Sequence, residues 1–326
     1  MILRNGWRAA ASACLVLLLI QSGFTQQFGQ KIDEINADGT GYEELYLVPQ
    51  NSAVGSPAIS ADGKWLALEF SNLRISNGRL AETGSRHAWL RTFELSKLRK
   101  VPAAQRTQPV TSEQPGVVLA GTGNGSMPSW SPKANRLAFT ISASGGVYVM
   151  TREGSQLSRV HPKGWGATWS PNGRMVAYFS SPNGDALMCY DLVEDEEFIV
   201  LRNLSNRIDS DFAWSPDSRS LAFSDHTRQG TAVIARCDML KRDTYQELRT
   251  RIVACGSSWH PDGKRLPFAK LDRLPYQLRT IPETPEEPDN QSPPEMIPGV
   301  PETVSAGDPV WSPNGKKILF VGSPTR

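Results

Sequence analysis

A short phrase that recurs six times constrains the fold of this chain more than any other feature. Each copy has an anchor residue, a polar turn that usually reads Ser-Pro-Asn/Asp-Gly, and a short apolar run that ends at Phe. A unit repeated this often predicts a repeat architecture. The anchors are Ile59, Trp130, Trp169, Trp214, Trp259 and Trp311. The copies span Ser56–Phe70, Met127–Phe139, Gly166–Phe179, Asp211–Phe223, Gly256–Phe268 and Gly307–Phe320.

Each copy predicts a β-hairpin. In the turn, Pro presets φ, Asp or Asn bonds the nearby backbone, and Gly supplies a positive φ. The run that leaves the turn alternates, as in Lys-Trp-Leu-Ala-Leu-Glu-Phe over residues 64–70. Such alternation is typical of a strand buried on at least one face. The turn at Ala134-Asn135 is the loosest of the set.

The spacing of the copies predicts the architecture. The Trp anchors recur roughly every 40–50 residues, which is typical of four-stranded propeller blades. A second strand pair should follow each hairpin. We expect these pairs at Gly146–Met150 with Leu157–Val160, at Ala186–Leu192 with Phe198–Leu201, and at Thr231–Cys237 with a strand near Tyr245–Leu248. The chain is therefore predicted to be all-β, a six-bladed β-propeller of four-stranded blades.

The two ends of the chain are expected to share the last blade. No second pair follows the sixth hairpin before Arg326, and a spare pair, Lys31–Gly41 with Glu44–Leu47, precedes the first. We predict that the N-terminal pair completes the blade that begins near Asp308. Such closure joins the chain ends and removes an open sheet edge.

The repeated Trp-Ser-Pro-Asp/Asn-Gly-Lys-x-Leu-Ala-Phe, with strands such as Val147–Met150 and Ile32–Gly39, resembles the WD-repeat-like propeller of the TolB family. The resemblance covers about residues 28–326. TolB is the periplasmic component of the Tol–Pal cell-envelope system. The resemblance therefore implies a non-catalytic scaffold that binds a protein partner, with an envelope lipoprotein as a candidate. Propeller domains of secreted peptidases and lyases use similar phrases, so a propeller enzyme of lyase or hydrolase type remains an alternative.

Residues 1–25 predict a secretory signal peptide. Arg4 and Arg8 precede the apolar run Ala9–Ile20, which is shorter than the roughly 20 residues of a membrane span. We expect cleavage near Ser22–Gln27, a propeller over 26–326, and a periplasmic or secreted location. A retained anchor, which would make a membrane-tethered scaffold, stays open. The formal charge of +2 is too small to create a positive field that would attract nucleic acid. We also expect a monomer with no integral membrane span.

Two segments interrupt the repeat. Ser96–Gly116 contains four basic residues and three prolines. Pro282–Glu302 contains six acids, seven prolines and no Lys or Arg, a composition that stays solvated. Both should connect the third and fourth strands of a blade, on the face of the repeated turns. They are predicted to be solvated loops, with partner-contacting arms as the alternative.

The sequence carries no recognisable catalytic, cofactor or metal signature. Its four histidines form no zinc motif, and no Gly-x-Ser-x-Gly occurs. The Asp and Asn residues of the repeat are interpreted as turn chemistry and the Trp anchors as core. Beyond the signal, Cys189, Cys237 and Cys255 are expected to be buried, with a disulfide as the alternative, although the first two are expected to lie too far apart to form one.

The binding surface is predicted on the face opposite the repeated turns, where the blade-to-blade connections gather around the channel. Mixed charge and an exposed Trp on that face suit a protein partner. The candidate partner-binding residues are Trp165, Asp211, His226, Arg228, Arg273 and Asp308.

Overall fold

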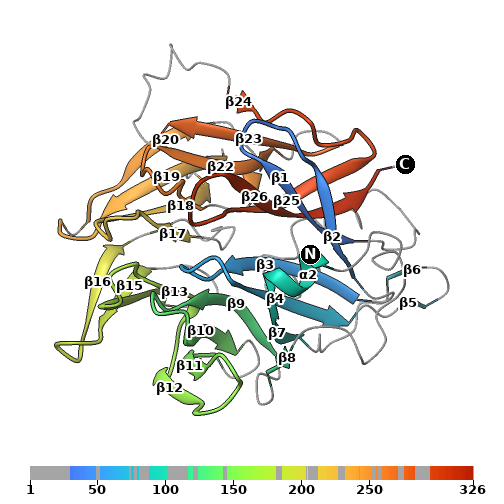
Figure 1. Cartoon of the computed structure of the whole chain (residues 1–326). Helices are drawn as coiled ribbons and strands as arrows, with labels where there is room; N and C mark the ends of the chain where they lie inside the picture. Colours follow the sequence, from blue (N-terminus) through green and yellow to red (C-terminus); the bar gives the residue numbers. More distant parts are fainter. Residues whose placement is uncertain are drawn as a thin grey trace.

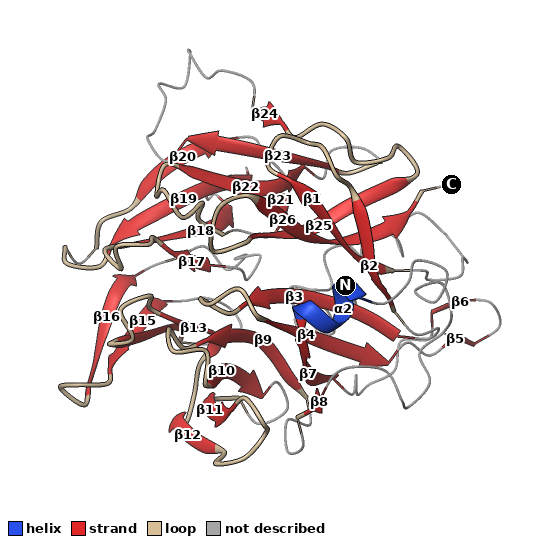
Figure 2. Ribbon diagram, viewed as in Figure 1, coloured by secondary structure: helices blue, strands red, loops and turns tan. Residues whose placement is uncertain are grey.

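A computed structural model shows six four-stranded antiparallel sheets arranged in a ring (Figure 1). Strands make up almost all of the regular structure (Figure 2). The structure describes residues 30–48, 52–72, 75–76, 79–80, 88–100, 117–119, 124–141, 145–180, 186–202, 204, 212–226, 232–241, 243–250, 254–255, 258–270, 275–282 and 294–325. The predicted signal peptide and the domain boundary after residue 25 lie outside these residues.

Five blades are continuous in the chain, and their strands run in order from the channel outward. Blade one is β3 (Ser52–Ile59), β4 (Trp65–Asn72), β7 (Ala88–Glu94) and β8 (Val117–Val118). Blade two is β9 (Gly125–Trp130), β10 (Arg136–Ile141), β11 (Val147–Thr151) and β12 (Ser158–His161). Blade three is β13 (Trp165–Trp169), β14 (Met175–Phe179), β15 (Ala186–Asp191) and β16 (Glu196–Arg202). Blade four is β17 (Phe212–Trp214), β18 (Ser220–His226), β19 (Ala232–Asp238) and β20 (Gln246–Thr250). Blade five is β21 (Ala254–Cys255), β22 (Arg265–Lys270), β23 (Gln277–Pro282) and β24 (Glu295–Met296).

The sixth blade confirms the predicted closure. It consists of β25 (Val304–Trp311), β26 (Lys317–Pro324), β1 (Lys31–Asn36) and β2 (Glu43–Leu47). β1 pairs with β26 without interruption, from Lys31 opposite Gly322 to Asn36 opposite Lys317. Because this ladder joins the first strand of the chain to the last, the ring closes through backbone hydrogen bonds.

The repeated turns form by the expected local chemistry. In blade one, the carbonyl of Ser60 accepts from the amide of Gly63 at 2.8 Å. The Asp62 carboxylate accepts from the Ser60 hydroxyl at 2.5 Å and from the Lys64 amide at 3.1 Å. The same two bonds, from the Ser hydroxyl two residues before and from the amide two residues after, are made in blades three, four and six by Asn172, Asp217 and Asn314. The interpretation of these residues as turn chemistry is confirmed.

A second repeated hydrogen bond fixes the connections between third and fourth strands. The residue that follows the third strand donates its amide to a carbonyl in the repeated turn, as Leu95 does to Lys64 at 2.8 Å and Leu192 to Arg174 at 2.8 Å. The equivalent donors Arg152, Met239 and Ala37 bond Asn135, Arg219 and Lys316. These connections and the repeated turns therefore share one face, the turn face. The blade-to-blade links leave from the other, the connection face.

Most Trp anchors are core residues, as predicted. Trp130, Trp214, Trp259 and Trp311 are buried, whereas Trp169 is half-buried. Three indoles donate to the preceding blade: Trp130 to the Ala58 carbonyl at 2.9 Å, Trp214 to Thr168 at 3.2 Å, and Trp259 to Ala213 at 3.0 Å. The acceptor is each time the residue before the anchor of the neighbouring blade, so the indoles link blades around the ring.

The two insertions contain more structure than the sequence predicts. Ser96–Gly116 begins within a short helix, α2 (Leu95–Lys100), whose Leu95 and Leu98 are buried against the core of blades six and one. This part is not a solvated loop, because two leucines three residues apart present one apolar face to that core. Glu295–Met296 of the acidic segment pairs as β24, and Ile297 is buried. Residues 101–116 and 283–293 lie outside the described part. A small hairpin, β5 (Ile75–Ser76) with β6 (Arg79–Leu80), completes the described structure.

Two cysteines lie at the junction of blades three and four. Cys189 and Cys237 are free thiols buried in the same apolar cluster. Burial raises the pKa of each thiol to about 12, which keeps both protonated and unreactive.

Candidate functional site

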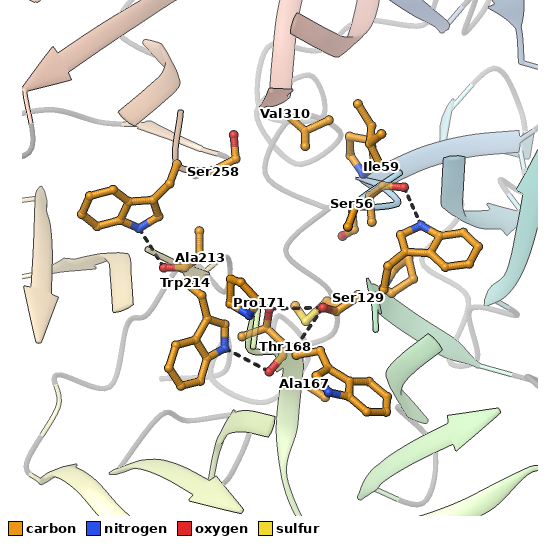
Figure 3. Close-up of a pocket in the computed structure, with 18 of the residues that line it drawn as sticks. Ser56, Ile59, Ser129, Ala167, Thr168, Pro171, Ala213, Trp214, Ser258 and Val310 are labelled. Carbon is orange, nitrogen blue, oxygen red and sulfur yellow. Dashed lines mark hydrogen bonds between the residues drawn. The ribbon is translucent and has the colours of Figure 1, made fainter. Parts of the chain in front are cut away.

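The centre of the ring holds a cavity of about 340 Å³ that residues from the first hairpin of all six blades line (Figure 3). Its wall is mostly apolar, with Ile59, Met127, Ala167, Ala213 and Val310 among its residues. The only acidic or basic residue that lines it within the described part of the chain is Asp308. A concave apolar wall with few polar groups is typical of a binding site.

The hydroxyl groups in the wall take part in contacts between blades. Ser129 Oγ accepts from the Trp169 amide at 2.9 Å and lies 3.3 Å from Thr168 Oγ1 (Figure 3). Ser258 Oγ accepts from the Trp311 amide at 3.1 Å. These side chains therefore join neighbouring innermost strands, which makes the wall rigid.

One end of the channel is framed by residues in left-handed backbone conformation. Ser56, Met127, Gly166 and Asp308 have φ of 46°, 54°, 68° and 45°. Each coincides with a break in the ladder between the first and second strands, a β-bulge. For the three residues other than Gly, this conformation costs roughly 1–3 kcal/mol each, and such strain clusters at functional sites.

Second strands of the preceding blades hold two of these bulges in place. The Met127 amide donates to Glu69 Oε2 at 3.2 Å, and the Gly166 amide donates to Thr140 Oγ1 at 3.0 Å. Both contacts are buried. The strained backbone is therefore maintained by side chains that reach it from the neighbouring blade.

Sequence reasoning missed these bulges, although the repeat carries a signal for them. All four residues stand three positions before an anchor, and Pro follows Ser56, Met127 and Asp308. Pro lacks the amide donor that a regular ladder needs, so it favours a bulge. Asp211 and Gly256 hold the same place before Trp214 and Trp259, and they lie outside the described residues.

The predicted contact residues do not all lie where the sequence suggested. Trp165 was expected on the exposed rim, but only 6% of it is exposed, and it packs in the core between blades three and four. The reason is that β13 begins at Trp165 itself, so its side chain points into the blade. Asp308 lies in β25, 7% exposed, in the cavity wall. His226 ends β18. Asp211, Arg228 and Arg273 lie outside the described residues.

The described part of the chain shows neither the residue pattern of a metal site nor that of a membrane-spanning helix. No group of three or more His, Cys, Asp or Glu lies together there as metal ligands would. None of the described helices is both long and apolar enough to cross a bilayer.

The fold and its channel define this protein as a six-bladed β-propeller of four-stranded blades, closed by strands from both ends of the chain. Its fold resembles the propeller of solved TolB structures. It is similar to a putative TolB from Agrobacterium tumefaciens (15% identity, 92% of this chain and 100% of that one, TM-score 0.65). It is also similar to TolB from Acinetobacter baumannii (15% identity, 94% of this chain and 67% of that one, TM-score 0.57).

Enzymes are also among the similar proteins. An oligogalacturonate lyase in complex with manganese matches 91% of this chain and 72% of its own (11% identity, TM-score 0.51). An uncharacterized peptidase, YuxL of Bacillus subtilis, is 27% identical over 157 residues, 47% of this chain but only 20% of that protein. No protein-family profile matches the chain. At these identities the likeness shows the fold alone.

Proposed function

We propose that this protein is an exported, non-catalytic scaffold that binds a protein partner at the channel from the connection face. The strained bulges of Ser56, Met127 and Asp308 around an apolar cavity are the observation that carries the proposal. Backbone strain of this kind persists only where the surrounding structure maintains it. A rigid wall also loses little conformational entropy when a partner binds.

The lining of the cavity indicates the chemistry of the partner. Asp308 contributes a carboxylate to a wall whose other described residues are apolar or carry hydroxyl groups. Asp211 holds the same place in the repeat of blade four. A partner segment with small apolar side chains and a cationic group complements such a site. By likeness to TolB, a lipoprotein of the cell envelope is the first candidate, and the periplasm is the proposed location.

The test is capture of envelope proteins by the tagged mature protein. Reversing charge at Asp211 and Arg228 together, as Asp211→Lys with Arg228→Glu, should reduce recovery of the partner while the Tm stays nearly unchanged. Lys133→Glu with Glu153→Lys is the matched control, because it also leaves the net charge unchanged and both residues are exposed on the turn face. Equal recovery by the wild-type protein and the Asp211/Arg228 variant would exclude the connection face as the binding site.

A propeller enzyme of lyase or hydrolase type is the second candidate. Its support is the likeness to an oligogalacturonate lyase and to a peptidase. Turnover of pectate fragments or peptides by the purified protein, abolished by a substitution in the channel wall such as Asp308→Asn, would favour it over the scaffold.

A further inference from the structure

A basic residue stands at the entry to the second strand of every blade. It comes at the end of the repeated turn and either precedes the second strand or is its first residue. All six of these residues are exposed, and they lie on the turn face. We call them the basic ring: Lys64, Arg136, Arg174, Arg219, Lys264 and Lys316.

The turns that carry the basic ring adjoin one another. The Asn172 amide of blade three donates to Ser218 Oγ of blade four at 3.0 Å. Between blades five and six, His260 Nε2 lies 3.3 Å from the Gly315 carbonyl oxygen. Three other turn glycines lie so close to a proline of the neighbouring turn that an added Cβ would contact it; the pairs are Gly63 with Pro313, Gly173 with Pro132, and Gly263 with Pro216. The basic side chains therefore start from a nearly continuous circle of turns.

Few carboxylates balance this circle. The six residues that follow each anchor include nine Lys or Arg but only three Asp over the whole repeat. Those three carboxylates already accept hydrogen bonds inside their turns, as Asp62 does from the Ser60 hydroxyl and the Lys64 amide. Arg174 pairs with Asp191 and Glu194. Among the described residues, the other five members of the basic ring form no ion pair.

The outer part of the turn face has no such excess of positive charge. The connections between third and fourth strands lie farther from the centre of the ring, and they carry both signs. Arg152 pairs with Glu153 and Lys97 with Glu94, and blade three adds the acidic Asp195. A broad anionic surface such as a membrane would meet these outer acids as well as the basic ring. A narrow acidic segment would meet the basic ring alone, so charge complementarity favours the segment.

The central cavity also reaches this face. Ala61, Pro132 and Pro171, which belong to the repeated turns of blades one to three, line it. The basic ring therefore surrounds the turn-face end of a concave site. Because neighbouring turns contact each other, their backbone loses little conformational entropy when a ligand binds.

We propose that the basic ring binds an acidic segment of a protein partner, which lies across the turn-face end of the cavity. Its carboxylates pair with ring members of successive blades, such as Lys264, Lys316 and Lys64 of blades five, six and one. This surface is opposite the connection face, so the inference does not rest on the function proposed above.

The probe is a labelled twelve-residue peptide of alternating Asp and Gly, titrated by fluorescence anisotropy into the full-length mature protein at low ionic strength. Lys264→Glu with Lys316→Glu should weaken binding about tenfold or more, because two attractive contacts become repulsive. The same variant should show a smaller loss of affinity as salt is added. Both side chains are exposed and form no ion pair among the described residues, so the Tm should stay nearly the same.

The matched control is Lys163→Glu with Arg202→Glu. It changes the net charge by the same amount, but both residues are exposed at blade-to-blade links on the connection face. This control should bind the peptide almost as the wild-type protein does. A peptide of alternating Asn and Gly should not bind.

Several outcomes would overturn the proposal. One is equal affinity of the wild-type protein and the Lys264/Lys316 variant for the acidic peptide. Another is an equal loss of affinity in the Lys163/Arg202 control, which would mean that net charge rather than the basic ring attracts the peptide. Flotation of the wild-type protein with phosphatidylglycerol vesicles, abolished in the Lys264/Lys316 variant, together with no binding of the peptide, would assign the basic ring to a membrane surface instead.

Discussion

Arg99 Nη2 lies 2.5 Å from Oε2 of Glu34, a carboxylate with no exposed surface. Arg99 belongs to α2 in blade one, and Glu34 lies in the N-terminal strand that closes the ring. Lys317 of β26 bonds the other oxygen of the same carboxylate. One buried group therefore joins the insertion helix, the first strand and the last strand.

The first prediction follows from this contact. Glu34→Gln should lower the free energy of unfolding by about 1–3 kcal/mol, because the amide loses the negative charge and keeps only one acceptor oxygen for the two cations, which can still reach solvent. Arg99→Met should cost less, since Lys317 remains as a partner. Urea unfolding of the two variants measures both changes. An unchanged midpoint for Glu34→Gln would mean that this contact does not stabilise closure.

Removal of the closing strands should destabilise the opposite end of the chain. Deleting Gln26–Tyr46 takes away β1 and nearly all of β2, so β26 becomes an unpaired edge. We expect a lower Tm and faster amide exchange within Lys317–Pro324. If the truncated protein has the same Tm as the full mature chain and the same amide exchange rates in this strand, closure contributes nothing to stability.

The Trp anchors should differ in how much each contributes to the free energy of unfolding. Trp214→Ala should cost about 3–5 kcal/mol, as for other large buried aromatics. Trp169→Ala should cost less, because this residue is half-buried and its indole bonds only the Gly173 carbonyl of its own turn. Asp217→Ala, which loses local turn bonds, is the mild control. Equal losses for the two Trp variants, measured by chemical denaturation, would contradict this ranking.

Asp33 should make stability depend on pH. Burial raises the pKa of this carboxyl to about 7 from an ordinary 3.8, Glu44 adds to the rise, and Tyr42 and Lys31 oppose it. The folded state therefore retains a proton that the unfolded state releases between pH 3.8 and about 7. The free energy of unfolding should fall as pH rises through this interval. Asp33→Asn should remove that part of the slope, and denaturation across the pH range measures it. If the Asp33→Asn variant shows the same dependence of unfolding free energy on pH, other titratable groups cause that dependence.

The N-terminus decides between an exported and a tethered scaffold. We expect the mature protein to begin between Ser22 and Gln27 and to appear in the soluble extracytoplasmic fraction. N-terminal sequencing of the purified protein tests this. Recovery of Met1 from washed membranes would support the tethered form instead.

Much of the fold could be predicted from the repeat because its signals are local. Pro, Asp and Gly act within a few residues to make each turn, and alternation defines the strand that follows. Strand pairs expected at Ala186–Leu192 and Phe198–Leu201 are observed at Ala186–Asp191 and Glu196–Arg202. The copies also predicted the number of blades and the closure, because a spare pair at one end matched a missing pair at the other.

The candidate site depended on contacts that the sequence does not display. Glu69 and Thr140 support bulges in the next blade, 58 and 26 positions away along the chain. Trp165 was expected to be exposed because a loop was predicted there, yet the strand begins at that residue.

The sequence by itself determined the repeat, the turn chemistry and the all-β architecture, since these depend on neighbours in the chain. Only the tertiary structure decided which repeat positions are strained, which Trp is buried and what Glu34 binds. Those outcomes depend on how adjacent blades pack, and packing brings together residues as far apart as Glu34 and Lys317.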